Sequence, residues 1–342
     1  MDTMVGIGWT IVGAIFLGTF ALPSKYIKNF AWENTWGAFF LFAMLIVPVA
    51  FACATVNGLW SSYANIPGSV IFWVIALGFL WGCGFCCWGY GLSMLGLSLG
   101  YALTMGTMAL VGSIVPFFLG SAEMATTLPG MVVIGGILIC ICGVGINGFS
   151  GVIRERGQGG GGDDAGGKKV NIGLGVLVCV TAGVLSSGLN IAFHIGGDIA
   201  TVAGKEFGNP DWLKGMAVWN LIFIGGFLSS VAFSVIMLCK NKTWGGFKNV
   251  GSTKNIIFAI IMAVGHFLCI FFYGVGAWKL GPLGTSVGFA IFQSGALLLG
   301  IGLGFFTGEW KDASAESKKC MFIGLGTLIG GIIIVSIGNA LS

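Results

Sequence analysis

Two histidines are the side chains best suited to carry a proton near neutral pH. His266 interrupts a long apolar run. His194 lies four residues after Asn190 and four before Asp198, which places all three on one face of a helix. A lone histidine in an apolar helix is more often a hydrogen-bonded core residue, and His194 also reads as part of a solvated helix end. Glu33, at the start of another apolar run, is a third candidate, although a glutamate there also suits a helix N-terminus.

A second group of residues combines uncharged hydrogen-bonding groups with aromatic rings inside the apolar runs. Its members are Trp81, Tyr101, Asn190, Trp219, Asn220, His266 and Gln293. Such a set suits a neutral polyhydroxyl ligand, because hydroxyl groups need hydrogen-bond partners and the C–H faces of a sugar pack well on aromatic rings. The runs contain no basic cluster, which argues against phosphorylated cargo, and no row of carboxylates, which argues against a dedicated cation exporter.

The composition requires these side chains to be held by membrane helices. The 342 residues are 56% hydrophobic and 8% charged, whereas soluble chains are about 25% charged. A span needs about 20 apolar residues, and the sequence predicts ten spans in an all-α membrane protein. They cover residues 4–22, 36–55, 70–91, 95–119, 127–148, 172–192, 213–238, 256–278, 284–306 and 320–341.

Other chemistry finds little support. The ten cysteines lie mostly in apolar runs, and Cys83, Cys86 and Cys87 have no histidine or carboxylate nearby, which favours packing over a disulfide framework or a metal site. No nucleophile–base pair and no nucleic-acid signal is present, so we expect neither an enzyme nor a nucleic-acid partner. The expected partners are a small molecule and the lipid bilayer. We expect no cofactor other than a coupling proton, and a monomer or homodimer.

A glycine-rich linker predicts two halves. Residues 1–150 and 171–342 each hold five predicted spans, and residues 151–170 between them include the run GQGGGGDDAGG. Five is an odd number, so the second half must enter the membrane from the opposite side. Two related halves in opposite orientation form an inverted repeat, which is typical of secondary transporters.

An internal repeat supports this division. Gly89, Gly91, Leu95 and Gly96 recur 185 residues later as Gly274, Gly276, Leu280 and Gly281, and the same offset relates Trp81 to His266. We therefore expect Trp81 and His266 to line one cavity between the halves. The predicted structural corners that allow the halves to rock are Gly89, Gly96, Gly274, Gly281, Pro282 and Gly284.

The basic residues predict the orientation. Thirteen of the 16 lysines and arginines follow the first, fifth, seventh and ninth spans, and the other three are Lys205, Lys214 and Lys279. Cytoplasmic loops carry the excess of positive charge, so we expect both termini outside a plasma membrane and the linker in the cytoplasm.

Several stretches resemble the L-rhamnose–proton symporter family. They are Ala21-Leu22-Pro23-Ser24-Lys25-Tyr26-Ile27-Lys28 with Trp32-Glu33-Asn34-Thr35-Trp36, Trp81-Gly82-x-Gly84, Leu95-Gly96-x-Ser98-x-Gly100, Gly281-Pro282-x-Gly284-x-Ser286-x-Gly288 and Gly308-Glu309-Trp310-Lys311. The resemblance implies the ten-helix fold of the drug/metabolite transporter superfamily and import of a deoxy-hexose with a proton by alternating access. Two alternatives stay open: an exporter of amphipathic metabolites or amino acids in the same fold, and a non-transporting membrane sensor.

Overall fold

The structure is a computed structural model that describes residues 2–95, 97–157, 172–306, 308 and 310–342, and every element within them is helical. The long helices are α1 (Asp2–Thr19), α5 (Gly68–Leu95), α6 (Leu97–Ser121), α7 (Leu128–Gly157), α8 (Ile172–Ser186), α12 (Met216–Asn241), α13 (Ser252–Lys279), α14 (Gly284–Phe306) and α15 (Ala315–Leu341). The shorter ones are η1 (Leu22–Tyr26), α2 (Trp32–Phe40), η2 (Leu41–Ile46), α3 (Val47–Thr55), α4 (Leu59–Ala64), η3 (Ala122–Thr126), α9 (Gly188–Ile195), α10 (Gly197–Lys205), α11 (Asp211–Lys214), η4 (Thr243–Lys248) and η5 (Gly281–Leu283).

These elements form ten segments long and apolar enough to cross a membrane within the described residues, which confirms the predicted number. The second span is built from α2, η2 and α3, and the sixth from α8, α9 and α10. Large apolar side chains such as Phe72, Ile236 and Ile333 remain exposed, which is what a lipid-facing surface requires. The chain is therefore a multi-pass membrane protein.

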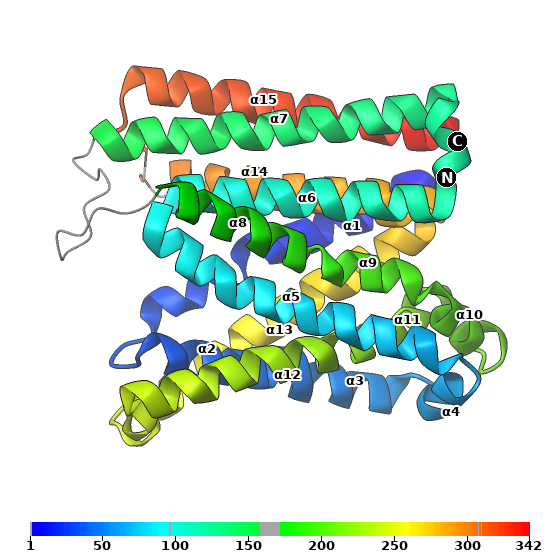
Figure 1. Ribbon diagram of the computed structural model, residues 1–342, viewed down its shortest axis with the longest axis horizontal. Helices are drawn as coiled ribbons and strands as arrows, with labels where there is room; N and C mark the ends of the chain where they lie inside the picture. The colour runs from blue at the N-terminus through cyan, green and yellow to red at the C-terminus, as the bar shows by residue number, and fades with distance from the viewer. Residues whose placement is uncertain (1, 96, 158–171, 307, 309) are drawn as a thin grey trace.

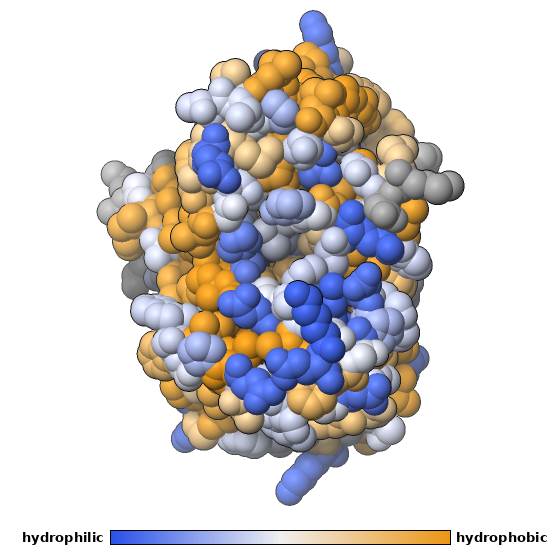
Figure 2. Space-filling model, turned by 90° about the vertical axis from the view of Figure 1, so that its right-hand side faces the viewer, coloured by the Kyte–Doolittle hydropathy of each residue, from blue (hydrophilic) through white to orange (hydrophobic). Residues whose placement is uncertain are grey.

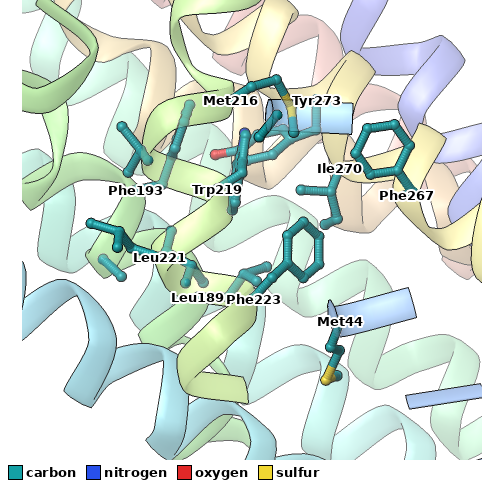
Figure 3. Packing of buried hydrophobic residues seen from close by; sticks show 14 of the residues in the cluster. Met44, Leu189, Phe193, Met216, Trp219, Leu221, Phe223, Phe267, Ile270 and Tyr273 are labelled. Atoms are coloured by element: carbon teal, nitrogen blue, oxygen red, sulfur yellow. The ribbon is translucent and has the colours of Figure 1, made fainter. Parts of the chain in front are cut away.

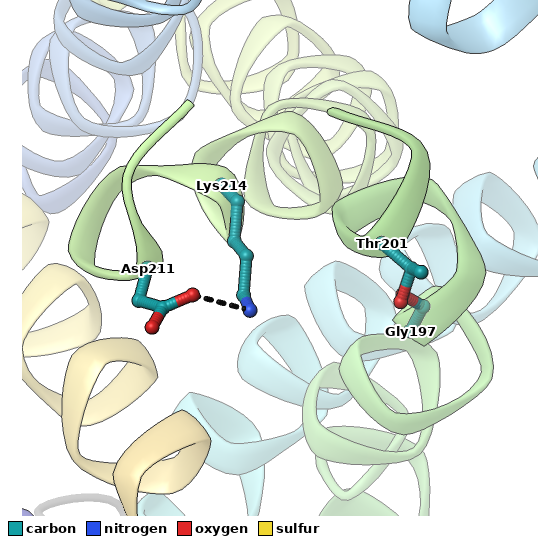
Figure 4. A network of polar contacts seen from close by, with 4 residues as sticks. All are labelled: Gly197, Thr201, Asp211 and Lys214. Atoms are coloured by element: carbon teal, nitrogen blue, oxygen red, sulfur yellow. Dashed lines mark hydrogen bonds and ion pairs between the residues drawn. The ribbon is translucent and has the colours of Figure 1, made fainter. Parts of the chain in front are cut away.

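The molecule has two ends, which Figure 1 shows at opposite sides of the view. The terminal end carries Asp2, Leu341, α10 and α11. The linker end carries the last turn of α7, the first turn of α8 and η4. The short helices α10 and α11 of the terminal end each contain a local polar contact: Thr201 Oγ1 donates to Gly197 O at 3.0 Å, and Lys214 Nζ lies 2.8 Å from Asp211 Oδ1 (Figure 4). Viewed end-on, this end gathers hydrophilic residues in its middle and lower part (Figure 2).

Helices α7 and α15 run antiparallel along one edge of the molecule and pack mainly on each other (Figure 1). Glycines allow the close approach: a Cβ built on Gly136 would lie 2.5 Å from Val335, and one on Gly143 would lie 2.8 Å from Leu328. Small residues let lipid-embedded helices come together in this way. The other eight spans surround the main core.

The core of those eight spans is aromatic (Figure 3). Trp219 stacks on Phe193 with 4.1 Å between ring centroids, and Tyr273 stacks on Phe292 at 4.8 Å. Trp219, Tyr273 and Phe292 are almost completely buried. This cluster fills the terminal half of the space between α9, α12, α13 and α14.

The corner between α13 and α14 requires glycine, as the sequence predicts. Gly281 has a φ of +77°, and Pro282 follows it in η5. A Cβ built on Gly284 would lie 1.8 Å from Ala277 O, and one on Gly274 would lie 2.5 Å from Trp219 Nε1. Gly89 has room for a side chain, because the nearest atom to an added Cβ is 4.0 Å away on Trp32. Gly96 lies outside the described residues.

Candidate functional site

A cavity of about 320 Å³ lies between the two halves of the chain. Small-ligand sites typically enclose about 300–1,000 Å³. Its lining comes from α1, α2, α5, α6, α8, α9, α13 and α14, including α6 and α14, the fourth and ninth spans. It reaches from the middle of α5 and α13 toward the linker end, where Trp36, Trp88 and Gly300 line it.

His266 and Trp81 meet in the wall of this cavity. Their rings are nearly parallel, with an interplanar angle of 8° and centroids 6.0 Å apart. Phe20 and Phe39 approach the imidazole edge-on at 5.3 and 5.5 Å. The His266 side chain is buried, and its Nδ1 has no hydrogen-bond partner among the described residues. An unpartnered buried nitrogen costs about 1–3 kcal/mol, so the site favours a ligand that offers the imidazole a hydrogen bond.

Tyr101 and Gln293 face the cavity from two neighbouring helices, α6 and α14. The side chain of Gln293 makes no hydrogen bond to any described residue although it is largely buried. Thr104 on the same wall already donates to Cys179 O at 3.2 Å. Free amide groups beside indole and phenol rings form a surface that can hydrogen-bond hydroxyl groups and pack against C–H faces.

Comparison with known proteins bears on this cavity. The family described as "L-rhamnose-proton symport protein (RhaT)" matches residues 1–341. This chain belongs to the L-rhamnose-proton symport protein family.

Its relatives in that family are similar over nearly their whole length. The chain is 26% identical over 343 residues to an L-rhamnose-proton symporter of Citrobacter koseri, and 25% identical over 344 residues to one of Pectobacterium atrosepticum. One from Klebsiella pneumoniae is 26% identical, and each alignment covers 98% of both chains. A solved crystal structure covers 98% of this chain with a TM-score of 0.59 at 16% identity, which indicates a shared fold.

Three of the polar residues predicted to line the cavity of this symport family member lie outside it. Asn190 Nδ2 donates to Gly112 O at 2.6 Å and to Thr285 O at 2.7 Å, and its Oδ1 accepts a hydrogen bond from Tyr273. It therefore joins α9 to α6, α13 and α14 on the terminal side of the cavity. Trp219, in its stack with Phe193, belongs to the same layer.

Asn220 is held near the terminal end by Tyr63. Its Nδ2 donates to Tyr63 Oη at 3.1 Å, and Tyr63 Oη donates to Ala217 O at 2.9 Å. Burial raises the pKa of Tyr63, so this hydroxyl stays protonated and keeps its role as a donor. Asn220 thus fastens α4 to α12.

Glu33 also lies outside the cavity lining, at the linker end. Its Oε1 accepts hydrogen bonds from Thr243 Oγ1 at 2.6 Å and Asn241 Nδ2 at 3.0 Å. The neighbouring Asn34 donates to Thr243 O at 2.9 Å. These bonds fasten the first turn of α2 to the end of α12 and the start of η4.

His194 stands at the opposite end. Its Nδ1 lies 2.9 Å from Thr285 Oγ1, and both line a second cavity of about 320 Å³ with Trp278 and Pro282. No hydrogen bond or ion pair joins it to Asp198, the partner that the helical spacing suggested, and Asp198 is exposed. The two histidines therefore lie in different cavities.

Sequence reasoning missed part of the cavity wall. Trp36, Phe85 and Trp88 line it together with Phe20. Trp88 meets Tyr101 edge-on at 5.9 Å, and Phe85 meets Trp36 at 5.6 Å. The position of Trp88 seven residues after Trp81, about two helical turns along the same face of α5, is the signal that could have found it.

Proposed function

We propose that this protein is a secondary transporter that moves a small neutral sugar, of the rhamnose-like deoxy-hexose type, together with a proton. The single observation that carries the proposal is the cavity in which the Trp81–His266 stack, Tyr101 and Gln293 come together. Its relatives named L-rhamnose-proton symporters support the choice of cargo and ion.

In this proposal the cavity opens to one side of the membrane at a time. Toward the terminal end it is closed by the Phe193–Trp219–Tyr273 cluster and by the hydrogen bonds of Asn190. Toward the linker end its wall runs along α1, α5, α6 and α14 to Gly300, which is exposed. With the linker in the cytoplasm, as the distribution of basic residues favours, this arrangement is the inward-facing one.

The packing of the helices supports two inverted repeats of five spans. Helix α1, the first span of the first half, packs on α13 and α14, the third and fourth spans of the second half. In the same way α8, which begins the first span of the second half, packs on α5 and α6, the third and fourth spans of the first half. Likewise α12 packs on α5 as α2 packs on α13. Two repeats related by a pseudo-twofold axis are expected to make such matched contacts. Rocking of one repeat against the other gives alternating access.

In this proposal the imidazole of His266 binds the coupling proton. Protonation creates a cation that Trp81 and the surrounding phenylalanines stabilise, and gives the ring a second N–H that can donate to a sugar hydroxyl. Gln293 supplies a further donor and acceptor for hydroxyl groups, and the indoles of Trp81 and Trp88 supply apolar faces. Glu33 and His194 are the weaker candidates for the proton, because neither lines this cavity.

Uptake of radiolabelled L-rhamnose into proteoliposomes tests the proposal. We expect uptake to rise when an inward proton gradient is imposed and to fall when an ionophore dissipates it. No gradient-dependent uptake of any deoxy-hexose would overturn the proposal. Counterflow against a panel of amino acids and amphipathic metabolites would then identify an exporter, and binding without flux would identify a sensor.

A further inference from the structure

A third cavity, of about 290 Å³, lies on the other side of the α6–α14 wall from the central one. It is bounded by α6, α7 and α14 and by the loop that holds Trp310, at the linker end. Tyr101 and Gly300 line both this cavity and the central cavity. A molecule bound here would therefore touch the wall of the proposed sugar site without entering it.

Among the residues that the structure describes, Arg154 is the one charged residue that lines this cavity. It ends the fifth membrane span, and its guanidinium lies 4.7 Å from the centre of the Trp310 ring. That ring is its one interaction partner among the described residues. Trp310 is 5% exposed and packs with Ala313 and Met321. The cation is thus held on a fixed ring at the membrane boundary with its N–H groups available.

Helix α7, which forms one wall of the cavity, is fastened to α15 on its other side. Ser150 Oγ donates to Ser317 O and Ser317 Oγ donates to Ser150 O, both at 2.7 Å, which fastens α7 to α15. Asn147, one turn earlier on α7, lines the cavity and is 7% exposed. Its amide packs against α15, where a Cβ built on Gly324 would lie 2.5 Å from Asn147 Nδ2. The remaining lining is mainly apolar or glycine, including Val144, Leu297 and Ile301.

We propose that this cavity binds the headgroup of an anionic phospholipid such as phosphatidylglycerol. Arg154 takes the phosphate, because a guanidinium can donate two parallel N–H bonds to phosphate oxygens. The acyl chains run along the apolar surface between α7 and α14, past the exposed Gly300.

The position favours a lipid over a soluble anion. Basic pockets between membrane helices on the side rich in lysine and arginine commonly hold anionic headgroups. The site combines one cation at the membrane boundary with apolar walls at membrane depth. A lipid can contact both, whereas a free phosphate ion can contact only the cation. The inference does not depend on what the central cavity transports.

Binding to the purified, delipidated protein tests the proposal by native mass spectrometry and by thermal unfolding in detergent. We expect phosphatidylglycerol to bind and to raise the unfolding temperature, whereas phosphatidylcholine and inorganic phosphate do not. Arg154→Gln is expected to weaken phosphatidylglycerol binding about five-fold or more, and Arg154→Lys, which keeps the charge but loses the paired N–H donors, to weaken it less. Lys240→Gln, a cation at the same end but outside the cavity, is the matched control and should bind as the parent does.

A second variant keeps the test decisive if Arg154→Gln fails to fold. Gly300→Leu leaves Arg154 in place and fills the mouth of the cavity, where an added Cβ meets nothing within 4 Å. It should lose phosphatidylglycerol binding while keeping its unfolding temperature in lipid-free detergent. Equal binding by the parent, Arg154→Gln and Gly300→Leu would overturn the proposal, as would stabilisation by inorganic phosphate equal to that by phosphatidylglycerol.

Discussion

The imidazole of His266 lies parallel to the indole of Trp81, with 6.0 Å between the ring centroids, although 185 residues separate them in the chain. They occupy matched positions in the two halves, at the middle of α13 and α5. One residue from each half therefore meets its counterpart where the central cavity begins. In the proposed rocking of the halves, the two residues lie on opposite sides of the moving boundary, and we propose this contact as the place that couples a proton to the conformational change.

We expect His266→Gln to uncouple transport from the proton gradient. Glutamine keeps a hydrogen-bonding side chain but cannot gain a proton between pH 5 and 8. Counterflow of labelled rhamnose, which needs no gradient, should persist, while gradient-driven uptake should fall to the rate seen without a gradient. His194→Gln, in the second cavity, is the matched control and should keep the response. A His266→Gln protein that still concentrates sugar with the gradient would exclude His266 as the proton site.

Trp81→Leu should lower the apparent affinity for the sugar and for the proton together. The substitution removes an aromatic face that contacts both the cavity and the imidazole. The cation–π contact between Trp81 and protonated His266 is worth about 0.5–2 kcal/mol, so its loss weakens proton binding. Because proton binding and sugar binding are coupled in a symporter, we expect KM for rhamnose to rise roughly two- to thirty-fold at a fixed pH. Trp60→Leu, an exposed tryptophan in α4, is the control. An unchanged KM in Trp81→Leu would show that the stack does not contribute to binding.

The sequence predicted the broad architecture because its signals are local. Ten apolar runs gave ten spans, and the glycine corner at Gly281 and Gly284 follows from short-range backbone geometry. The repeat also placed Trp81 and His266 in one cavity, because matched positions in two similar halves tend to meet. These features need no knowledge of which helix faces which.

The assignment of single polar residues was less successful for a physical reason. Membrane helices are apolar on all sides, so their periodicity does not distinguish a face that lines a cavity from one that packs on a neighbour. Asn190 bonds to Gly112 and Thr285, 78 and 95 residues away, and Glu33 bonds to Asn241, 208 residues away. Only the fold shows that these partners exist.

Glu33→Gln should retain proton-coupled uptake. The side-chain oxygen of glutamine can still accept from Thr243 and Asn241, so the connection between α2 and η4 is preserved without a titratable group. Glu33→Ala removes the acceptor and should cost about 0.5–1.5 kcal/mol in stability, because two hydrogen bonds are lost while the exposed Asn241 and half-buried Thr243 can turn to water. Uptake across a pH series, with unfolding in detergent, measures both effects. Loss of the proton gradient response in Glu33→Gln would restore Glu33 as a proton carrier.

Asn190→Ala should loosen the closed terminal side. The change leaves Gly112 O, Thr285 O and the Tyr273 hydroxyl without their partner, at a cost of about 1–3 kcal/mol. Hydrogen exchange should become faster in α9 and in the terminal halves of α6 and α14. Asn241→Ala at the linker end is the control and should affect exchange only near α2 and η4. Unchanged exchange around α9 in Asn190→Ala would mean that these bonds do not hold the terminal side closed.

Gly284→Ala and Gly89→Ala, at two of the predicted structural corners, should have opposite effects. The added Cβ at position 284 would lie 1.8 Å from Ala277 O, so the α13–α14 corner must open, at a cost of about 1–3 kcal/mol. At position 89 the nearest atom is 4.0 Å away, and alanine favours a helix interior by about 0.5–1 kcal/mol. Unfolding in a denaturing detergent series should therefore show Gly284→Ala below the parent and Gly89→Ala equal to it or above. A Gly284→Ala protein as stable as the parent would show that the corner adapts without loss.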